Sequence, residues 1–245
     1  MTMDKDERAS GKGEFANGLK DGIPIALGYF AVSFSLGITM VAAGITAAEG
    51  TVMSLTNLTS AGEFAGVRVI AAGGTIIEMI LTQLIINLRY SLMSLSLTQK
   101  LNENVKFWHK LIIAFGNTDE IFAVAMNHQK SLTLRYMGGL QLLPIVGWTL
   151  GTFLGIVACN LLPGKVSAAM SVMLYGMFIA IVVPVAKKSK AVLIVSSAAI
   201  MLSCLFRYVP GLKDISEGIS IIICTVAAAV LGAILFPVKT SEEET

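Results

Sequence analysis

Long apolar runs alternate with short polar breaks along this chain. A helix that crosses about 30 Å of hydrocarbon needs roughly 20 mainly apolar residues. The breaks carry Pro, Gly, Lys and Asp, which are typical of turns between helices. Runs of the required length predict six full spans, at 22–46, 70–98, 134–160, 166–186, 190–209 and 216–238. The pattern therefore predicts an all-α integral membrane protein, a polytopic helix bundle in which sequence neighbours are antiparallel.

Two further stretches, 51–68 and 111–126, are only moderately apolar and carry acidic residues near their middle. If both cross the membrane, Lys and Arg favour one side of it only weakly. If both dip in and return, most Lys and Arg fall on one side, which the positive-inside rule identifies as the cytoplasm. Re-entrant backbone is tolerated only where it lies against protein or a hydrated cavity. We therefore expect two broken or re-entrant segments that line a cavity, and two cytoplasmic termini.

The two stretches also resemble each other. Residues 59–65 read TSAGEFA and residues 117–123 read NTDEIFA, each a polar and acidic patch followed by Phe-Ala. An inverted repeat that meets near the bilayer midplane is one interpretation, and two unrelated polar breaks is the other. The domain prediction is a cytoplasmic tail at 1–21, a transmembrane domain at 22–238 and a cytoplasmic tail at 239–245.

The composition agrees with a membrane location. Hydrophobic residues make up 55% of the chain and charged residues 14%, against about 25% charged in soluble domains. The net charge of +2 gives no large field that would attract nucleic acid.

The first 21 residues are polar, which predicts no cleaved signal peptide. Each of Cys159, Cys204 and Cys224 lies in an apolar run without metal-ligand spacing, so we expect helix packing and neither a metal nor a cofactor.

Charged residues inside the predicted span 70–98 are the first candidates for function. At 100° per residue, Glu78, Thr82 and Arg89 form one polar stripe, with Asn87 on the opposite side. Glu78 and Arg89 lie about 16 Å apart along the axis, too far to pair, so each needs a partner on another helix or water. We interpret Glu78, Thr82, Asn87 and Arg89 as lining a pathway. The alternative is a structural polar contact, with Arg89 extending to the interface.

The broken segments are the second group of candidates. Freed backbone groups in such segments can bind a carboxylate or an ammonium group. The alternative is that the segments are surface loops whose acidic residues are solvated. The predicted substrate-binding residues are Ser60, Glu63, Phe64, Asn117, Asp119 and Glu120. Glu78 is the predicted carrier of a coupling proton, because burial raises a carboxyl pKa, and we expect it to meet Glu63 and Asp119 in one midplane cavity.

Three glycines at four-residue spacing, Gly147, Gly151 and Gly155, form a doubled GxxxG pattern. Such a face allows close approach of another helix. Its partner is either a helix of this chain or a second subunit.

Enzyme motifs are missing from the sequence. It contains no GxxxxGK[ST], HExxH or GxSxG, and no Ser/His or paired-Asp arrangement for intramembrane proteolysis. We therefore expect no enzyme activity and no ATP hydrolysis by the chain itself. A transporter of this kind is driven by an ion gradient or by another subunit.

Three elements resemble the AzlC family, the large subunit of bacterial branched-chain amino acid exporters. They are GLKDGIPIALGY at 18–29, NLRYSLMS at 87–94 and TDEIFA at 118–123. Two departures leave the substrate open: Glu63 stands where the family usually has Gln, in S-G-A-x-Q-F, and Tyr90 stands where it usually has His. The resemblance implies a small four-helix partner of the AzlD type.

The sequence predicts a multi-pass secondary transporter subunit in the cytoplasmic membrane of a bacterium. The resemblance implies export of a branched-chain or other hydrophobic amino acid, in exchange for protons or another ion. Glu63 or Asp119 would accept the substrate's ammonium group, and broken-helix N-termini would bind its carboxylate. One alternative is the permease of an ATP-driven transporter, with 99–110 as the coupling element. Another is a membrane scaffold subunit without transport.

Overall fold

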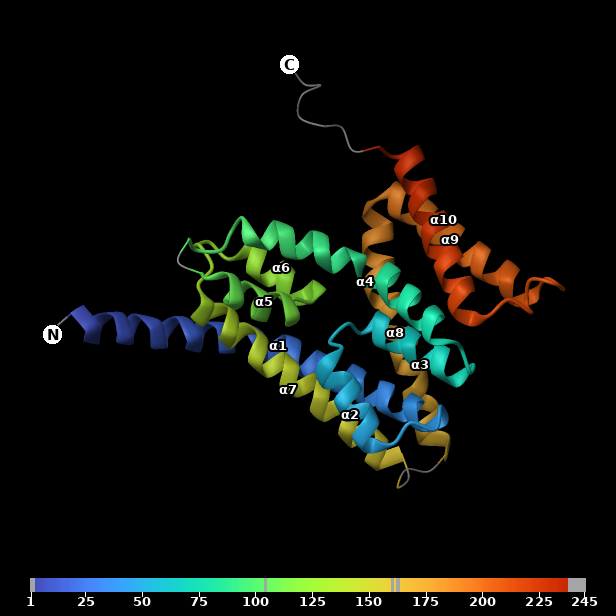
Figure 1. Cartoon of the computed structure of the whole chain (residues 1–245), viewed down its shortest axis with the longest axis horizontal. Helices are drawn as coiled ribbons and strands as arrows, with labels where there is room; N and C mark the ends of the chain where they lie inside the picture. The colour runs from blue at the N-terminus through green and yellow to red at the C-terminus, as the bar shows by residue number, and fades with distance from the viewer. Residues whose placement is uncertain (1–2, 104, 160, 162–163, 238–245) are drawn as a thin grey trace, which may run out of the picture. The chain divides into compact units, whose positions relative to one another are not determined.

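The structure is a computed structural model that describes residues 3–103, 105–159, 161 and 164–237 (Figure 1). The predicted tail at 239–245 lies outside the described residues. The described residues are helical apart from turns and one isolated bridge between Leu101 and Leu132. The helices are α1 (Met3–Ala42), α2 (Ala47–Thr56), α3 (Ala61–Ala71), α4 (Ile76–Thr98), α5 (Phe107–Phe115), α6 (Asp119–Asn127), α7 (Leu134–Cys159), α8 (Gly164–Lys188), α9 (Lys190–Tyr208) and α10 (Glu217–Leu235).

The prediction of an all-α polytopic membrane protein is confirmed. Within the described part of the chain, five helices are long and apolar enough to cross a membrane. They are Gly13–Ala42 of α1, and α4, α7, α9 and α10 in full. The remaining predicted span, 166–186, coincides with the long helix α8.

The predicted span 22–46 is too long at its end, because a local stop signal closes α1 at Ala42. Gly44 has a φ of +77°, and the Ile45 amide donates to the Met40 carbonyl at 3.0 Å. This is the Schellman arrangement that ends many helices. Thr46 then caps α2 in a reciprocal capping box with Glu49. Residues 43–46 therefore form a turn.

The predicted span 70–98 begins too early for the same reason. Gly73 has a φ of +67°, and the Gly74 amide donates to the Val69 carbonyl at 2.9 Å, which ends α3. The spanning helix α4 starts only at Ile76.

The chain divides into two compact units, which are described separately. The first comprises Met1–Glu63 and Asn87–Met173, and the second Phe64–Ile86 and Leu174–Thr245. The boundaries fall inside α3, α4 and α8, so each of these helices contributes to both units.

The first unit is built around α1 and α7, which run side by side (Figure 1). Glycines let the two backbones approach closely: a Cβ on Gly147 would lie 2.6 Å from the Ala26 carbonyl oxygen, and one on Gly22 would lie 2.7 Å from the Leu140 carbonyl oxygen. Cβ atoms on Gly151 and Gly155 would also overlap the α1 backbone. The partner of the predicted GxxxG face is therefore a helix of this chain.

The predicted re-entrant segment 111–126 is a hairpin of two short helices, α5 and α6. Each has nine residues and rises about 14 Å, so neither can cross the membrane alone. Backbone hydrogen bonds tie the two ends of the hairpin together, from Asn102 to Leu132 and from Leu132 to Lys100, both at 2.9 Å. The segment therefore returns to where it starts, and it packs through Ile113 and Ile121 into the core of the unit.

The second unit contains α9, α10 and the adjoining parts of α3, α4 and α8. Arg68 of α3 pairs with Glu217 at the start of α10, and Glu78 of α4 accepts a hydrogen bond from the Gly218 amide at 2.7 Å. No residue of α9 is buried, and its exposed residues are mainly apolar. Such a surface suits contact with lipid.

Candidate functional site

The break between α5 and α6 places acidic side chains inside the first unit. Thr118 is the N-cap of α6, and its hydroxyl accepts the Ile121 amide at 3.4 Å. Asp119 and Glu120 follow in the first turn, where the helix dipole favours negative charge. Asn117, 3% exposed, donates to Ser94 at 3.3 Å and fixes the break to α4.

Tyr29 of α1 reaches this helix start. Its hydroxyl oxygen lies 2.5 Å from Thr118 Oγ1 and 2.5 Å from Glu120 Oε2. A phenol has one hydrogen, so it donates to one neighbour and accepts from the other. The carboxylate cannot donate when ionised, so Tyr29 donates to Glu120 and Thr118 donates to Tyr29. The three side chains thus lock the start of α6 onto α1.

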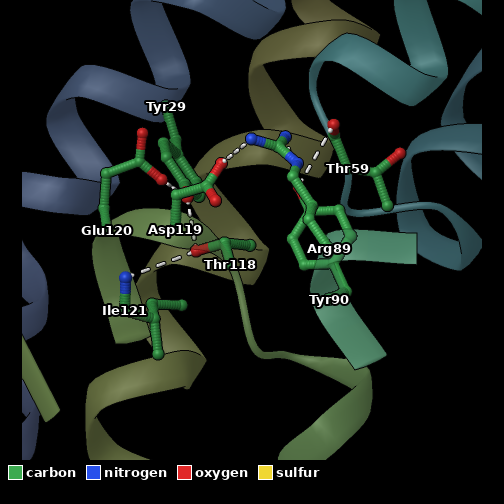
Figure 2. A network of polar contacts seen from close by, with 8 residues as sticks. All are labelled: Tyr29, Thr59, Arg89, Tyr90, Thr118, Asp119, Glu120 and Ile121. Atoms are coloured by element: carbon green, nitrogen blue, oxygen red, sulfur yellow. Dashed lines mark hydrogen bonds and ion pairs between the residues drawn. The ribbon is translucent and has the colours of Figure 1, made fainter. Parts of the chain in front are cut away.

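Arg89 of α4 supplies the positive charge of the site, as Figure 2 shows. Its Nη1 lies 2.6 Å from Asp119 Oδ2, and its Nη2 donates to the Tyr90 hydroxyl at 3.1 Å. Tyr90 in turn lies 3.4 Å from the Thr59 carbonyl oxygen, in the break between α2 and α3. The partner that Arg89 was predicted to need on another helix is therefore Asp119. Arg89 thereby connects the two broken segments.

A narrow crevice that is too small to hold a water molecule lies beside this ion pair. The polar network thus closes on itself in this conformation. The crevice is lined by Tyr29, Leu58, Ser60, Tyr90, Thr118, Glu120 and Trp148. Ser60 has a φ of +38°, a left-handed backbone conformation that non-glycine residues seldom adopt. Such strain is often found at functional sites.

Glu63 lies next to the crevice, fully buried in a ring of polar contacts. Trp148, which lines the crevice, donates its indole N–H to Glu63 Oε2 at 2.7 Å. Ser54 donates to the other carboxyl oxygen and lies 2.7 Å from Thr152 Oγ1. Thr152 donates to the Trp148 carbonyl at 3.2 Å, which closes the ring. Tyr29 meets the same indole edge-to-face, with ring centroids 5.4 Å apart.

The number of hydrogens in this ring depends on the protonation of Glu63. A hydroxyl has one hydrogen to donate. When Glu63 is ionised, the Ser54 hydroxyl donates to it. The single hydroxyl hydrogen of Thr152 can then be donated either to Ser54 or to the Trp148 carbonyl, so one of these two contacts lacks a hydrogen. When Glu63 is protonated, its own O–H donates to Ser54, Ser54 donates to Thr152, and every contact is satisfied. The ring therefore accommodates either state and is complete in the neutral one.

Burial also favours the neutral form of Glu63. Glu63 lies in α3, outside the membrane-spanning helices, and burial raises its pKa from the ordinary 4.5 to about 7, although the hydrogen bonds from Ser54 and Trp148 lower it. A carboxyl group with this pKa exchanges its proton near neutral pH.

Several predicted site residues lie in the second unit. Phe64 meets Tyr175 edge-to-face there, with ring centroids 5.7 Å apart. Thr82 is fully buried, and its hydroxyl has no hydrogen-bond partner among the described residues. Asn87 lies in the first unit, where its amide approaches so closely that a Cβ on Gly62 would lie 2.6 Å from it. The predicted residues that lie together in the first unit are therefore Ser60, Glu63, Asn87, Arg89, Asn117, Asp119 and Glu120.

Glu78, the predicted proton carrier, caps a helix. Its carboxylate is 7% exposed and accepts the buried Gly218 amide in the first turn of α10. A carboxylate at a helix N-terminus is stabilised by the free amides and the dipole. This contact explains the burial of Glu78 without a role in transport.

We expect Glu78→Ala to lower the free energy of unfolding by about 1–3 kcal/mol, because the Gly218 amide would lose its partner in a buried position. Glu78→Gln keeps an acceptor oxygen and should cost less. Thermal unfolding in detergent measures both. Equal unfolding midpoints for Glu78→Ala and the wild type would show that the cap does not stabilise α10.

Sequence reasoning missed the aromatic and hydroxyl members of the site. In the sequence, Tyr29 is simply the last residue of a family element, and Trp148 lies between two glycines of the GxxxG pattern. A signal was present on α7: Gln141, Trp148 and Thr152 recur at spacings of seven and four, which places three polar side chains on one helix face. All three are buried. Ser54 carried no comparable signal.

Among the described residues, no three His, Cys, Asp or Glu side chains gather closely enough to hold a metal ion. The acidic residues of the site contact Arg89, Tyr29, Ser54 and Trp148 instead.

The fold and the site define a multi-pass membrane protein with a partly buried polar cluster at two helix breaks. The AzlC family model, described as AzlC protein, matches residues 24–162, and the chain belongs to this family. An uncharacterized membrane protein of Archaeoglobus fulgidus is 30% identical over 191 residues, covering 77% of this chain and 84% of the relative. The inner membrane protein YgaZ of Escherichia coli is 28% identical over 177 residues, covering 69% and 72%. No solved structure matches the chain.

Proposed function

We propose that the protein is the large subunit of a secondary transporter that exports branched-chain or other hydrophobic amino acids in exchange for protons. The observation that carries this proposal is the ion pair of Arg89 with Asp119 at the two helix breaks, beside a crevice that Glu120 lines together with aromatic and apolar side chains. Charged groups within a membrane are costly unless they serve a pathway or pair with one another.

The charges of the crevice suit a zwitterion. Arg89 can bind a carboxylate in a bidentate manner, and Asp119 can accept an ammonium group. In the described conformation these two groups neutralise each other at 2.6 Å. An amino acid can replace each half of this ion pair with its own opposite charge, so binding leaves the net charge unchanged. Leu58, Tyr90 and Trp148 would then contact its apolar side chain.

Glu63 is the proposed proton carrier in place of Glu78. Its indole donor, Trp148, also lines the crevice, so a bound substrate and the Glu63 proton share one neighbour. A substrate that displaces the Trp148 ring changes the hydrogen bonds available to Glu63. This shared contact is a physical route for coupling substrate binding to proton release.

The proposed location is the cytoplasmic membrane of a bacterium, with a small AzlD-type subunit as partner. The partner rests on the family resemblance alone, and it would not bind at Gly147, Gly151 and Gly155, because α1 covers them. The permease alternative is less well supported. It requires a coupling helix in 99–110, and the helix that the described residues of this range enter is α5, which belongs to the hairpin with α6.

The test is transport of radiolabelled leucine by proteoliposomes that contain the full chain, with and without the small subunit. We expect Arg89→Gln and Asp119→Asn each to reduce transport 10- to 100-fold, because a charge-assisted hydrogen bond contributes about 1.5–3 kcal/mol. Excess 4-methylpentanoate, which lacks the ammonium group, and isoamylamine, which lacks the carboxylate, should both fail to compete.

Glu49→Gln is the matched control, because it removes an exposed carboxylate of the first unit and should leave transport unchanged. The exchange Arg89→Asp with Asp119→Arg separates binding from structure. It restores the ion pair, so thermal stability should recover while transport stays low. Full transport by the exchanged protein would show that the pair is only structural, and equal competition by isoamylamine would argue against a zwitterionic site.

A further inference from the structure

The second unit contains a cavity of about 640 Å³ at one end of α9 and α10. Basic side chains come from three different elements: Arg68 of α3, Arg207 of α9 and Lys213 of the loop between α9 and α10. Serine hydroxyls and the start of α10 add further hydrogen-bond donors. The volume is in the range of small-molecule binding sites.

The cavity carries net positive charge. Glu217 is its acidic residue, and it is already paired with Arg68. Arg207 and Lys213 have no ion-pair partner within the described part of the chain. Asp214, next to Lys213 in the sequence, is exposed and does not line the cavity. An anion would therefore be attracted by two unneutralised cations.

The position of the cavity indicates which anion. It lies where two membrane-spanning helices end, at Tyr208 of α9 and Glu217 of α10, and an exposed Tyr beside Arg and Lys is typical of the headgroup level. From Arg207 the lining of the cavity continues back along α9 through Cys204 to the apolar Ile200, about 10 Å from Arg207 along the helix axis. The lining is therefore cationic near the membrane surface and apolar towards its interior.

We propose that this cavity binds an anionic phospholipid, with its phosphate between Arg207 and Lys213 and an acyl chain along Ile200. Basic pockets between transmembrane helices bind lipid headgroups in this way. The site is independent of the transport site, because every residue that lines it belongs to the second unit.

The experiment measures lipid binding to the purified full chain in detergent by native mass spectrometry. Phosphatidylglycerol and phosphatidylcholine with identical acyl chains are compared, and inorganic phosphate is added as a competitor. We expect at least a tenfold preference for phosphatidylglycerol. Arg207→Gln with Lys213→Gln should weaken its binding about 25-fold, since each basic residue near a charged membrane surface contributes roughly a factor of five.

Lys187→Gln with Lys188→Gln is the matched control, because it removes two exposed cations from the end of α8, outside the cavity. It should change the affinity less than twofold. Ser203 lines the cavity and is exposed, so Ser203→Glu adds a negative charge there without disturbing the protein core. This variant should also prevent binding, and it tests the site independently if the double variant misfolds. An equal loss in the control, or binding unaffected by Ser203→Glu, would overturn the site. Displacement by inorganic phosphate alone would show a free-anion site and overturn the lipid assignment.

Discussion

Gly155→Ala is expected to prevent recovery of folded protein, although it adds a single methyl group. A Cβ at this position would overlap the Phe34 carbonyl oxygen and lie 2.9 Å from the Phe34 carbonyl carbon. Both atoms belong to the backbone of α1, so no side chain can rotate away. Overpacking usually costs about 1–3 kcal/mol or more even where side chains can adjust, and here the two helices must separate.

Gly28→Ala is the matched control on the same helix pair. A Cβ on Gly28 meets nothing within 4 Å, and Ala favours helix over Gly by up to about 1 kcal/mol. The two substitutions should therefore affect stability in opposite ways. Gly28→Ala should keep or raise the thermal unfolding midpoint, whereas Gly155→Ala should give aggregated protein in size-exclusion chromatography. A monodisperse Gly155→Ala protein with the wild-type midpoint would contradict the close packing of α1 on α7.

Glu63→Gln is expected to remove much of the pH dependence of stability near neutral pH. The pKa of Glu63 is about 7 in the folded protein against an ordinary 4.5. Between these values the folded state holds a proton that the unfolded state releases. The contribution of Glu63 is therefore fully present below pH 4.5 and is lost as the pH rises to 7 and beyond, in total about 3 kcal/mol.

Gln imitates the neutral carboxyl group. It can accept the Trp148 indole N–H and donate to Ser54 at every pH. At pH 8 the variant should therefore unfold at a higher temperature than the wild type, and at pH 5 the two should agree closely. The measurement is thermal unfolding in detergent from pH 5 to 8.

Glu49→Gln is the control for this series. Hydrogen bonds from the Thr46 backbone and side chain lower the pKa of Glu49, so it stays ionised from pH 5 to 8. Its substitution should leave the wild-type pH dependence in place. A Glu63→Gln protein that loses stability with pH as steeply as the wild type would show that Glu63 is ionised throughout.

The spans were predictable from the sequence because their signal is length and hydropathy, which depend on no partner. Predicting their exact ends requires the residues that stop and cap each helix. Gly44 followed by Thr46 and Glu49 is a readable stop and start, but apolar residues on either side conceal it in a hydropathy profile. Gly73 ends α3 within an apolar run in the same way.

The site was predictable only in part. Acidic residues in broken segments pointed to Glu63, Asp119 and Glu120, since charge in an apolar bundle is conspicuous in any sequence. Their contacts were not predictable: the polar face of α7 marks Trp148, but which side chains it meets depends on how α1, α3 and α7 pack, and Tyr29 lies in an apolar run. The role of Glu78 cannot be assigned from the sequence, because a buried carboxylate that caps a distant helix has the same sequence pattern as one that carries protons.

The pairing of α1 with α7 also constrains the order in which the first unit assembles. The hydrogen bond from Thr133 to Glu14 joins residues 119 positions apart. At 5–20 residues per second, α1 leaves the ribosome roughly 6–24 s before its partner does. During that interval α2 to α6 are synthesised, and the glycine-lined face of α1 does not yet have α7 to contact. The α1–α7 contact can therefore form only after α7 has been made, so the crevice that Tyr29 and Trp148 line is among the last parts of the first unit to be completed.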